Sequence, residues 1–498
     1  MGKKLPIFYN ALLLTGVNLL LRLVGTGFQV YLSGKIGAAG IGLLQLVLSV
    51  GGMALTAGMA GIRTATMYIT AEELGKKRPE NVRWVLSGCI KYSLSCSIAV
   101  AMILYVIAPI VAERWIGNPD VAGVVRLFSY FLPVNCLTGV MVGYFTAANR
   151  IGTLSAVEVA EQGCSIGLTI SLLHFWAGDN LVRACAGVVL GSGLSACFTL
   201  VSLLYLRKKE RALVGSPISI RRRLYETAVP LALADDLKAG ISTTENLMVP
   251  KRLALCQKVG NPLAAFGMVC GMVFPLLMFP MAILFGLAEL LIPELARCAA
   301  AGSEQRIRYL AKRSLRIAIL YGCFFAGLLY LVGDDLCFWL YGNQEAGKYL
   351  RWFALLAPML YCDAITDAMI KGLGQQTACV RYNIVTSGLD VLFLFLLLPT
   401  YGIAGYFFSF LVTHLLNFFL SVRRLIKLTG KIIPISTVVF TLLATAGSII
   451  MSSFVSIPVL RGGAYVLLLG CILYLFQVIG QEDLSWLKGL IKRKGSQM

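Results

Sequence analysis

Charged residues are scarce in this sequence, and most of those present are basic. Of the 498 residues, 14% are charged and 58% are hydrophobic, and the excess of lysine and arginine gives a net charge of +20. Typical soluble domains carry about 25% charged residues, so the composition indicates an integral membrane protein without a visible soluble domain. The basic residues gather in short loops between apolar runs, where they orient a protein across a membrane, which argues against nucleic-acid binding.

Histidines are almost absent, and the cysteines are not paired. His174 and His414 are far apart, and no two of the 14 cysteines form a Cys-X-X-Cys motif. Most cysteines lie within apolar runs, where we expect small buried hydrophobic side chains rather than metal ligands or disulfides. No metal site, catalytic triad or phosphate-binding glycine loop can be assembled, so we expect neither an enzyme nor a cofactor.

Long apolar runs are abundant instead. Runs of roughly twenty residues recur along the chain and predict an all-α integral membrane protein with about fourteen transmembrane helices. Alternate connections are basic, so the positive-inside rule predicts a multi-pass protein of a bacterial cytoplasmic membrane with both termini in the cytoplasm. One basic connection, 250–261, lies on the opposite side. Either it serves the substrate path, or the helix before it is misplaced.

An internal repeat accompanies these runs. Lys35 to Gly37 is echoed by Lys258 to Gly260, and Pro133 by Pro358, at separations of about 224 residues. We therefore predict two six-helix bundles in the same orientation, at 1–206 and 224–427, with a basic linker at 207–223 and two further helices in 428–498. Parallel repeats of this kind are typical of transporters whose lobes rock about a central site.

Polar side chains inside the apolar runs are the candidate site. The first run places Asn18, Arg22 and Gln29 on one helix face. An arginine at that depth must face a partner or water, so we expect a polar cavity that receives an anion. Arg63 could reach either the headgroups or the cavity mouth. The predicted substrate-binding residues are Asn18, Arg22, Gln29, Arg63, Lys238 and Arg252.

Acidic residues form a second candidate set. Those near 158–161 either bridge to loop arginines or line the cavity, and those in the seventh run line water unless that helix lies along the interface. Asp235 can pair with Lys238 at helical spacing, and Asp367 is expected to pair structurally with Lys371. The predicted coupling or cavity acids are Glu158, Glu161, Asp235, Asp236, Glu245, Asp363 and Asp390.

Several segments together resemble a known group. The segments are RLVGTGFQVYLSGKIGAAG, AGIRTATMYITAEELGKK, GYFTAANRIGTLSAVEVAEQ, ENLMVPKRLALCQKVGN and IKGLGQQTACVRYNIVTSGLD. In this order they look like the stage V sporulation protein B and polysaccharide-biosynthesis branch of the multidrug/oligosaccharidyl-lipid/polysaccharide exporter superfamily. The resemblance covers nearly the whole chain.

The resemblance implies two six-helix bundles around a central cavity that flips undecaprenyl-diphosphate-linked sugars by alternating access. Arg22 matches the first of the arginines thought to hold the diphosphate in the related lipid II flippases. The family pattern expects a further arginine and an acid where this chain has Phe28 and Gln29. Glu161 matches the glutamate of the sporulation branch, and Glu245 takes the place of the acid before the Val-Pro-(Lys/Arg)-Arg-Leu motif.

These observations favour a flippase for a lipid-linked oligosaccharide or peptidoglycan precursor, in cell-wall or spore-cortex synthesis. A diphosphate cannot cross hydrocarbon uncompensated, and cavity arginines supply charge-assisted hydrogen bonds. The alternative is a multidrug exporter coupled to protons or sodium through the buried acids. A non-transporting scaffold would leave the buried charges unexplained. The expected partners are the lipid-linked sugar and membrane lipids, with the protein acting as a monomer.

Overall fold

All regular structure among the described residues is helical. The computed structural model describes residues 5–76, 78–178, 180–208, 220–430 and 435–476. By internal contacts the chain divides into a first unit, Met1–Gly271 with Asp390–Gly405, and a second unit, Met272–Leu389 with Tyr406–Met498. Most of the predicted linker lies outside the described residues, so the predicted domain limits remain a prediction.

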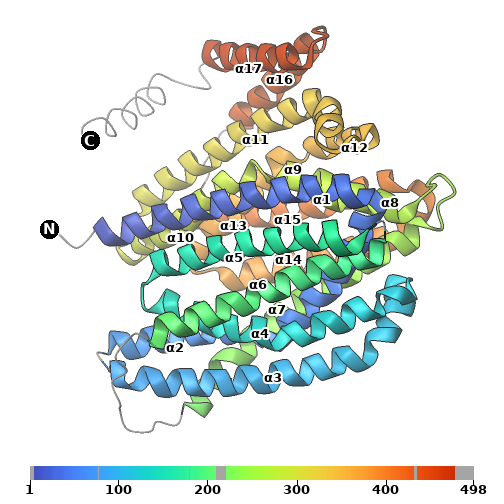
Figure 1. Cartoon of the computed structure of the whole chain (residues 1–498). Helices are drawn as coiled ribbons and strands as arrows, with labels where there is room; N and C mark the ends of the chain where they lie inside the picture. Colours follow the sequence, from blue (N-terminus) through green and yellow to red (C-terminus); the bar gives the residue numbers. More distant parts are fainter. Residues whose placement is uncertain (1–4, 77, 179, 209–219, 431–434, 477–498) are drawn as a thin grey trace. The chain divides into compact units, whose positions relative to one another are not determined.

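The first unit contains eight helices and the last part of a ninth (Figure 1). They are α1 (Leu5–Met59), α2 (Ile62–Gly75), α3 (Val82–Ile110), α4 (Ala122–Ala147), α5 (Ile151–Leu172), α6 (Leu181–Lys208), α7 (Arg221–Leu253) and α8 (Pro262–Met268), with the end of α14 (Gln376–Tyr401). Buried apolar side chains of α2, α3, α4 and the start of α7 share one core, which includes Ile62, Leu86, Phe145 and Leu224.

A kink divides α1. Gly37 has φ 67° and ψ 178°, which is outside helical geometry and in the left-handed range of φ that favours glycine. At about 1.5 Å per residue, 55 residues would exceed the roughly 30 Å hydrocarbon core more than twofold if they were straight. α1 therefore consists of two helical segments that meet at Gly37. They correspond to the first two predicted crossings, the second of which continues into α2.

The second half of α1 crosses α8 at very short range. A Cβ on Gly267 would lie 2.0 Å from the carbonyl oxygen of Ala38, and a Cβ on Gly42 would lie 2.3 Å from that of Leu263. Backbone atoms cannot move aside as a flexible side chain can. Glycine is therefore required on both helices, as in other close helix crossings within membranes.

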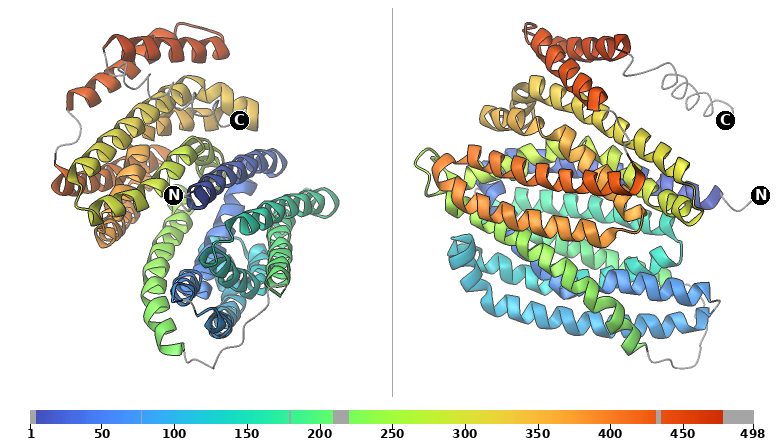
Figure 2. Two further views of the ribbon diagram at one scale, coloured as in Figure 1. Left: turned by 90° about the vertical axis from the view of Figure 1, so that its left-hand side faces the viewer. Right: turned by 180° about the vertical axis from the view of Figure 1, so that it is seen from behind.

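The second unit contains the remaining helices. They are α9 (Phe274–Met278), α10 (Met281–Ala300), α11 (Glu304–Tyr341), α12 (Gln344–Ala354), α13 (Ala357–Gly372), the first part of α14, α15 (Ile403–Thr429), α16 (Ile435–Ser452) and α17 (Pro458–Leu475). Figure 2 shows α16 and α17 side by side, and their buried residues pack with α11 around Tyr465. The Tyr465 hydroxyl donates to the carbonyl of Cys323, 3.0 Å away.

The protein is a multi-pass membrane protein. By length and composition, eight helical stretches of the described chain could cross a membrane, or ten when two bent pairs each count as one span. α5 and α7 do not meet these criteria, and the kinked α1 and α2 count as one stretch. The all-helical architecture is thus confirmed, and the number fourteen remains a prediction.

Candidate functional site

Arg22 lies on α1 next to a contact with α5. Its side chain is partly buried. On the preceding turn, Gln162 of α5 donates to the carbonyl of Leu21 at 2.8 Å. A Cβ at Gly25 would lie 3.3 Å from the amide nitrogen of Gln162, so the absence of a side chain at Gly25 accommodates the contact. The side chain of Asn18 lies outside the described part of the structure.

The acids of α5 face basic and polar groups of the same unit. Glu158 and Glu161 are partly buried, and Glu158 interacts electrostatically with Arg63, which is itself exposed. Glu161 lies against Thr199 of α6. Arg63 therefore has a carboxylate neighbour within its own unit. The arginine beside Glu158 belongs to α2 and not to a loop, and the cavity role of Glu161 remains a prediction.

Gln29 bonds to an irregular segment. Its amide nitrogen donates to the carbonyl of Gly271 at 3.2 Å. Gly271 lies in the π-helical turn Val269–Val273 that follows α8. Wide helical turns often occur at functional positions because they leave backbone groups available to other partners. The predicted polar face of α1 thus has at least two polar contacts within the first unit, at Leu21 and Gly271.

The polar middle of α7 does not show the predicted ion pair. Asp235 and Lys238 are both exposed, and no ion pair joins them among the described residues. Asp236 is partly buried, and its Oδ1 atom is buried with no hydrogen-bond partner. Among the three, Asp236 is the one enclosed by protein.

Further along α7, three polar side chains attach the helix to its neighbours. Thr243 donates to the carbonyl of Ser49 at 3.1 Å, and Asn246 donates to the Ser49 hydroxyl at 3.0 Å. Glu245 forms a carboxyl–carboxyl hydrogen bond with Asp390 of α14, which is 6% exposed. The two predicted acids therefore lie together, and α7 is bound on one side by α1 and on another by α14.

The two basic residues at the end of α7 bind backbone carbonyls. Lys251 donates to the carbonyl of Arg114, which lies in the π-helical turn Val111–Ile116 that follows α3. Arg252 donates twice to the carbonyl of Phe395, at 3.1 and 2.7 Å. The Arg252 guanidinium also lies 3.7 Å from the centre of the Phe395 ring. The basic connection that disagreed with the charge rule thus carries two residues that anchor α7, and Arg252 is held by α14.

In the second unit, α13 and α15 share a polar ladder. Asp363 accepts a hydrogen bond from Asn417 at 2.9 Å, and Asp367 accepts one from Ser421 at 3.1 Å. Asp363 Oδ1 and Asn417 Oδ1 are both buried, and neither has a hydrogen-bond partner among the described residues. Asp367 was expected to pair with Lys371, and the structure gives it the Ser421 hydroxyl instead.

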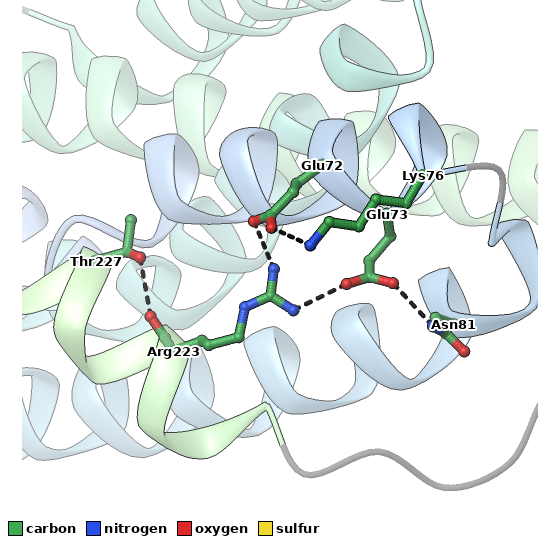
Figure 3. A network of polar contacts seen from close by, with 6 residues as sticks. All are labelled: Glu72, Glu73, Lys76, Asn81, Arg223 and Thr227. Carbon is green, nitrogen blue, oxygen red and sulfur yellow. Dashed lines mark hydrogen bonds and ion pairs between the residues drawn. The ribbon is translucent and has the colours of Figure 1, made fainter.

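One further cluster, shown in Figure 3, was not predicted from the sequence. Arg223 at the start of α7 donates to Glu73 at 2.8 Å and also binds Glu72, both on α2. Glu73 accepts a second bond from Asn81 at 2.8 Å and its side chain is 5% exposed, whereas Lys76 pairs with the exposed Glu72. No spacing rule links residues 150 positions apart, so only the structure reveals this clasp of α2 and α7.

Two family models match separate parts of the chain. Residues 7–232 match the family described as "Polysaccharide biosynthesis protein", and residues 258–396 match the MatE family. The stage V sporulation protein B of Bacillus subtilis (strain 168) is 20% identical over 460 residues, covering 90% of this chain and 88% of that protein. These matches support the resemblance of the chain to the multidrug/oligosaccharidyl-lipid/polysaccharide exporter superfamily.

Solved structures share the superfamily fold. Lipid II flippase MurJ in an inward closed conformation aligns with a TM-score of 0.70 and 10% identity, covering 93% of this chain and 98% of that one. A multidrug resistance MATE family transporter in an inward-facing conformation aligns with a TM-score of 0.64 and 16% identity, covering 84% and 100%. At these identities the likeness shows that this chain has the same fold as the flippase and the multidrug transporter.

Proposed function

We propose that this transporter flips a lipid-linked oligosaccharide or peptidoglycan precursor carried on undecaprenyl diphosphate, by alternating access. The observation that carries the proposal is Arg22, a partly buried guanidinium within an apolar helix, on a face that also presents Gln29. A diphosphate brings about two negative charges, and a desolvated guanidinium binds phosphate oxygens through paired, charge-assisted hydrogen bonds. The similarity to a sporulation protein and to a lipid II flippase supports the same substrate class.

The proposal assigns supporting roles to the other predicted residues. Arg63, with Glu158 beside it, would receive the headgroup near the start of α2, and Lys238 is exposed on α7. We assign Arg252 a structural role, since both its donor contacts go to the backbone of α14. We further propose a monomer in a bacterial cytoplasmic membrane, with both termini in the cytoplasm, associated with cell-wall or spore-cortex synthesis.

A second candidate, a cation-coupled multidrug exporter, is favoured by the buried acids. Glu245 and Asp390 can share their hydrogen bond only when one of them holds a proton. In the other unit, the buried carboxylate oxygen of Asp363 could take up a proton, or could coordinate a sodium ion together with the amide oxygen of Asn417. The same groups would also serve a proton-coupled or sodium-coupled flippase, so they bear on coupling more directly than on substrate.

Transport by purified full-length protein in liposomes separates the two candidates. For a flippase, Arg22→Ala should slow translocation of a defined undecaprenyl-diphosphate-linked sugar by about 10- to 100-fold, the equivalent of one charge-assisted interaction. Arg22→Lys should be intermediate, because it keeps the charge and loses the paired donors. The matched control is Arg83→Ala, at an exposed arginine of α3.

The acids provide the opposite arm of the experiment. Under the exporter proposal, Glu245→Gln and Asp363→Asn should abolish gradient-driven efflux of a cationic dye, and Arg22→Ala should leave that efflux within about twofold of the unaltered protein. If Arg22→Ala leaves the rate of translocation of the lipid-linked sugar unchanged, the flippase proposal is contradicted.

A further inference from the structure

A groove lies between the first turns of α7 and the N-terminal part of α3. It has a volume of about 380 Å³ and opens to the surface. Its lining combines aromatic, hydroxyl and basic side chains, namely Trp84, Ser87, Lys91, Tyr92, Arg221 and Tyr225. Gly88 and Ile220 also line the groove, and a Cβ on Gly88 would lie 2.4 Å from the Cδ1 atom of Ile220. Both walls belong to the first unit, and none of the predicted transport residues lines the groove.

Two cations of the groove lack an acidic partner within the described chain. Lys91 and Arg221 are exposed, and neither forms an ion pair there. Their neighbours differ, because Arg222 pairs with Glu226 at 2.8 Å and Arg223 is held by Glu72 and Glu73. The two positive charges that face the groove are thus the ones available to an external anion.

The groove lies where α3 passes from polar to apolar. The uninterrupted apolar part of this helix begins only at Ile98, so Lys91 and the aromatic side chains are at the height of a membrane interface. Trp84, Tyr92 and Tyr225 suit this position because each has an apolar ring and a polar atom. Tyr92 and Tyr225 pack edge to face, with ring centres 5.4 Å apart, and form a fixed aromatic wall.

Exposed apolar side chains continue from the groove along both helices. On α3 these are Leu94, Ile98 and Met102, and on α7 they are Val229 and Leu233. A soluble phosphate ion would make no contact with these apolar side chains, whereas the acyl chains of a lipid would cover them. The surface therefore favours a ligand that joins an anionic headgroup to hydrocarbon chains.

We propose that the groove binds the phosphate headgroup of an anionic membrane phospholipid. Lys91 and Arg221 bind the phosphate oxygens, Ser87 contributes a hydroxyl donor, and the acyl chains lie along Leu94 and Val229. The lipid occupies a site separate from the transported substrate, and its headgroup bridges α3 to the start of α7 beside the Arg223 clasp. The site is independent of which substrate the transporter carries.

Trp84 supplies a reporter for the test. The full-length protein is placed in phosphatidylcholine nanodiscs and titrated with phosphatidylglycerol whose chains carry bromine near the headgroup, and quenching is measured relative to Trp84→Phe. The double variant Lys91→Gln/Arg221→Gln should raise the half-saturating lipid fraction on the order of tenfold. The matched control Arg83→Gln/Arg222→Gln removes two charges from the same helices outside the groove and should change it less than about twofold.

Several results would overturn the proposal. Equal weakening in both double variants would mean general attraction to a basic surface, and equal quenching by brominated phosphatidylcholine would mean that no headgroup is recognised. Relief of quenching by inorganic phosphate at low concentration would mean a soluble-anion site. Thermal unfolding midpoints confirm that each variant is folded. Because no transport is measured, failure here leaves the flippase proposal untouched.

Discussion

Single residues hold the start of α7 on α2, and Glu73 is the centre of that contact. Its carboxylate is nearly inaccessible to water, and it accepts one bond from Arg223 and one from Asn81. A buried carboxylate that loses its charged donor must carry an uncompensated charge or take up a proton, and either change costs free energy. Arg222, one position earlier, forms an ion pair whose members are 90% and 60% exposed.

We therefore expect Arg223→Gln to lower the free energy of unfolding by about 1–3 kcal/mol, and Arg222→Gln to lower it by less than about 0.5 kcal/mol. Thermal unfolding of the purified protein in detergent measures both. The double variant Glu73→Gln/Arg223→Gln should recover part of the loss, because the buried charge is removed. Equal effects of the two arginine variants would mean that the contacts of Arg223 with Glu72 and Glu73 stabilise the fold no more than an exposed ion pair does.

Residue positions could be predicted from the sequence better than residue partners. Helical spacing placed Gln29, Glu245 and Asp363 inside the membrane segments as polar groups, and each has a polar partner in the structure. Their partners lie 242, about 145 and 54 positions away, respectively, and the partner of Gln29 is a backbone carbonyl. No local pattern in the sequence encodes contacts over such separations. Arg252 was predicted to contact substrate because its long-range carbonyl partner could not be foreseen.

At the scale of elements, a proline explains the contact between α7 and α14. Pro399 has no N–H group, so the carbonyl of Phe395, four residues earlier, receives no helical hydrogen bond. Arg252 supplies two donors to that carbonyl. The break in one helix thus creates the acceptor that fixes the end of the other.

This explanation predicts a coupling between two substitutions. Arg252→Ala should lower the free energy of unfolding by about 1–3 kcal/mol in the natural background. In a Pro399→Ala background the alanine N–H can reach the Phe395 carbonyl, so the same change should cost about 1 kcal/mol less. A thermal-unfolding double-mutant cycle measures the difference, and strict additivity would contradict the proposed role of Pro399. Arg252→Lys controls for the loss of charge.

Elements with uniform composition were easier to predict than broken ones. Each apolar run gave a helix, since no other structure satisfies the backbone within lipid. The sequence did not separate α8, α9 and α10, or α12 and α13, where bends of 59° and 54° interrupt the spans. Pro280 lies at the 59° bend, and α10 begins directly after it. The remaining bend depends on packing, which composition alone does not determine.

For the whole molecule, charge distribution remains the argument for orientation. The ends of α2 and the starts of α3 and α7 carry Lys76, Arg78, Arg83, Arg221 and Arg222, whereas the connection between α3 and α4 has two acids and one arginine. A bias of this kind predicts that the basic end lies in the cytoplasm. On this prediction the groove between α3 and α7 lies in the leaflet that faces the cytoplasm.

The orientation can be tested without a transport assay. A cysteine at the exposed position of Arg222 should react with a membrane-impermeant maleimide in inside-out vesicles and not in intact cells, with Cys471→Ser as background because that thiol is exposed. A cysteine at Asn118, in the connection between α3 and α4, should show the opposite pattern. Labelling of both positions from the same side would contradict the orientation and the even number of crossings.

The polarity of α7 also has a consequence for biosynthesis. As the ribosome delivers the chain, this helix can meet Ser49 at once, but Asp390 and Phe395 emerge about 140 residues later. Until then Glu245 and Arg252 lack their final partners. During this time α7 is a segment whose transfer into lipid is unfavourable, and the insertion machinery must keep it out of the hydrocarbon. Nascent chains that stop before α14 should therefore be degraded faster than chains that stop just after it.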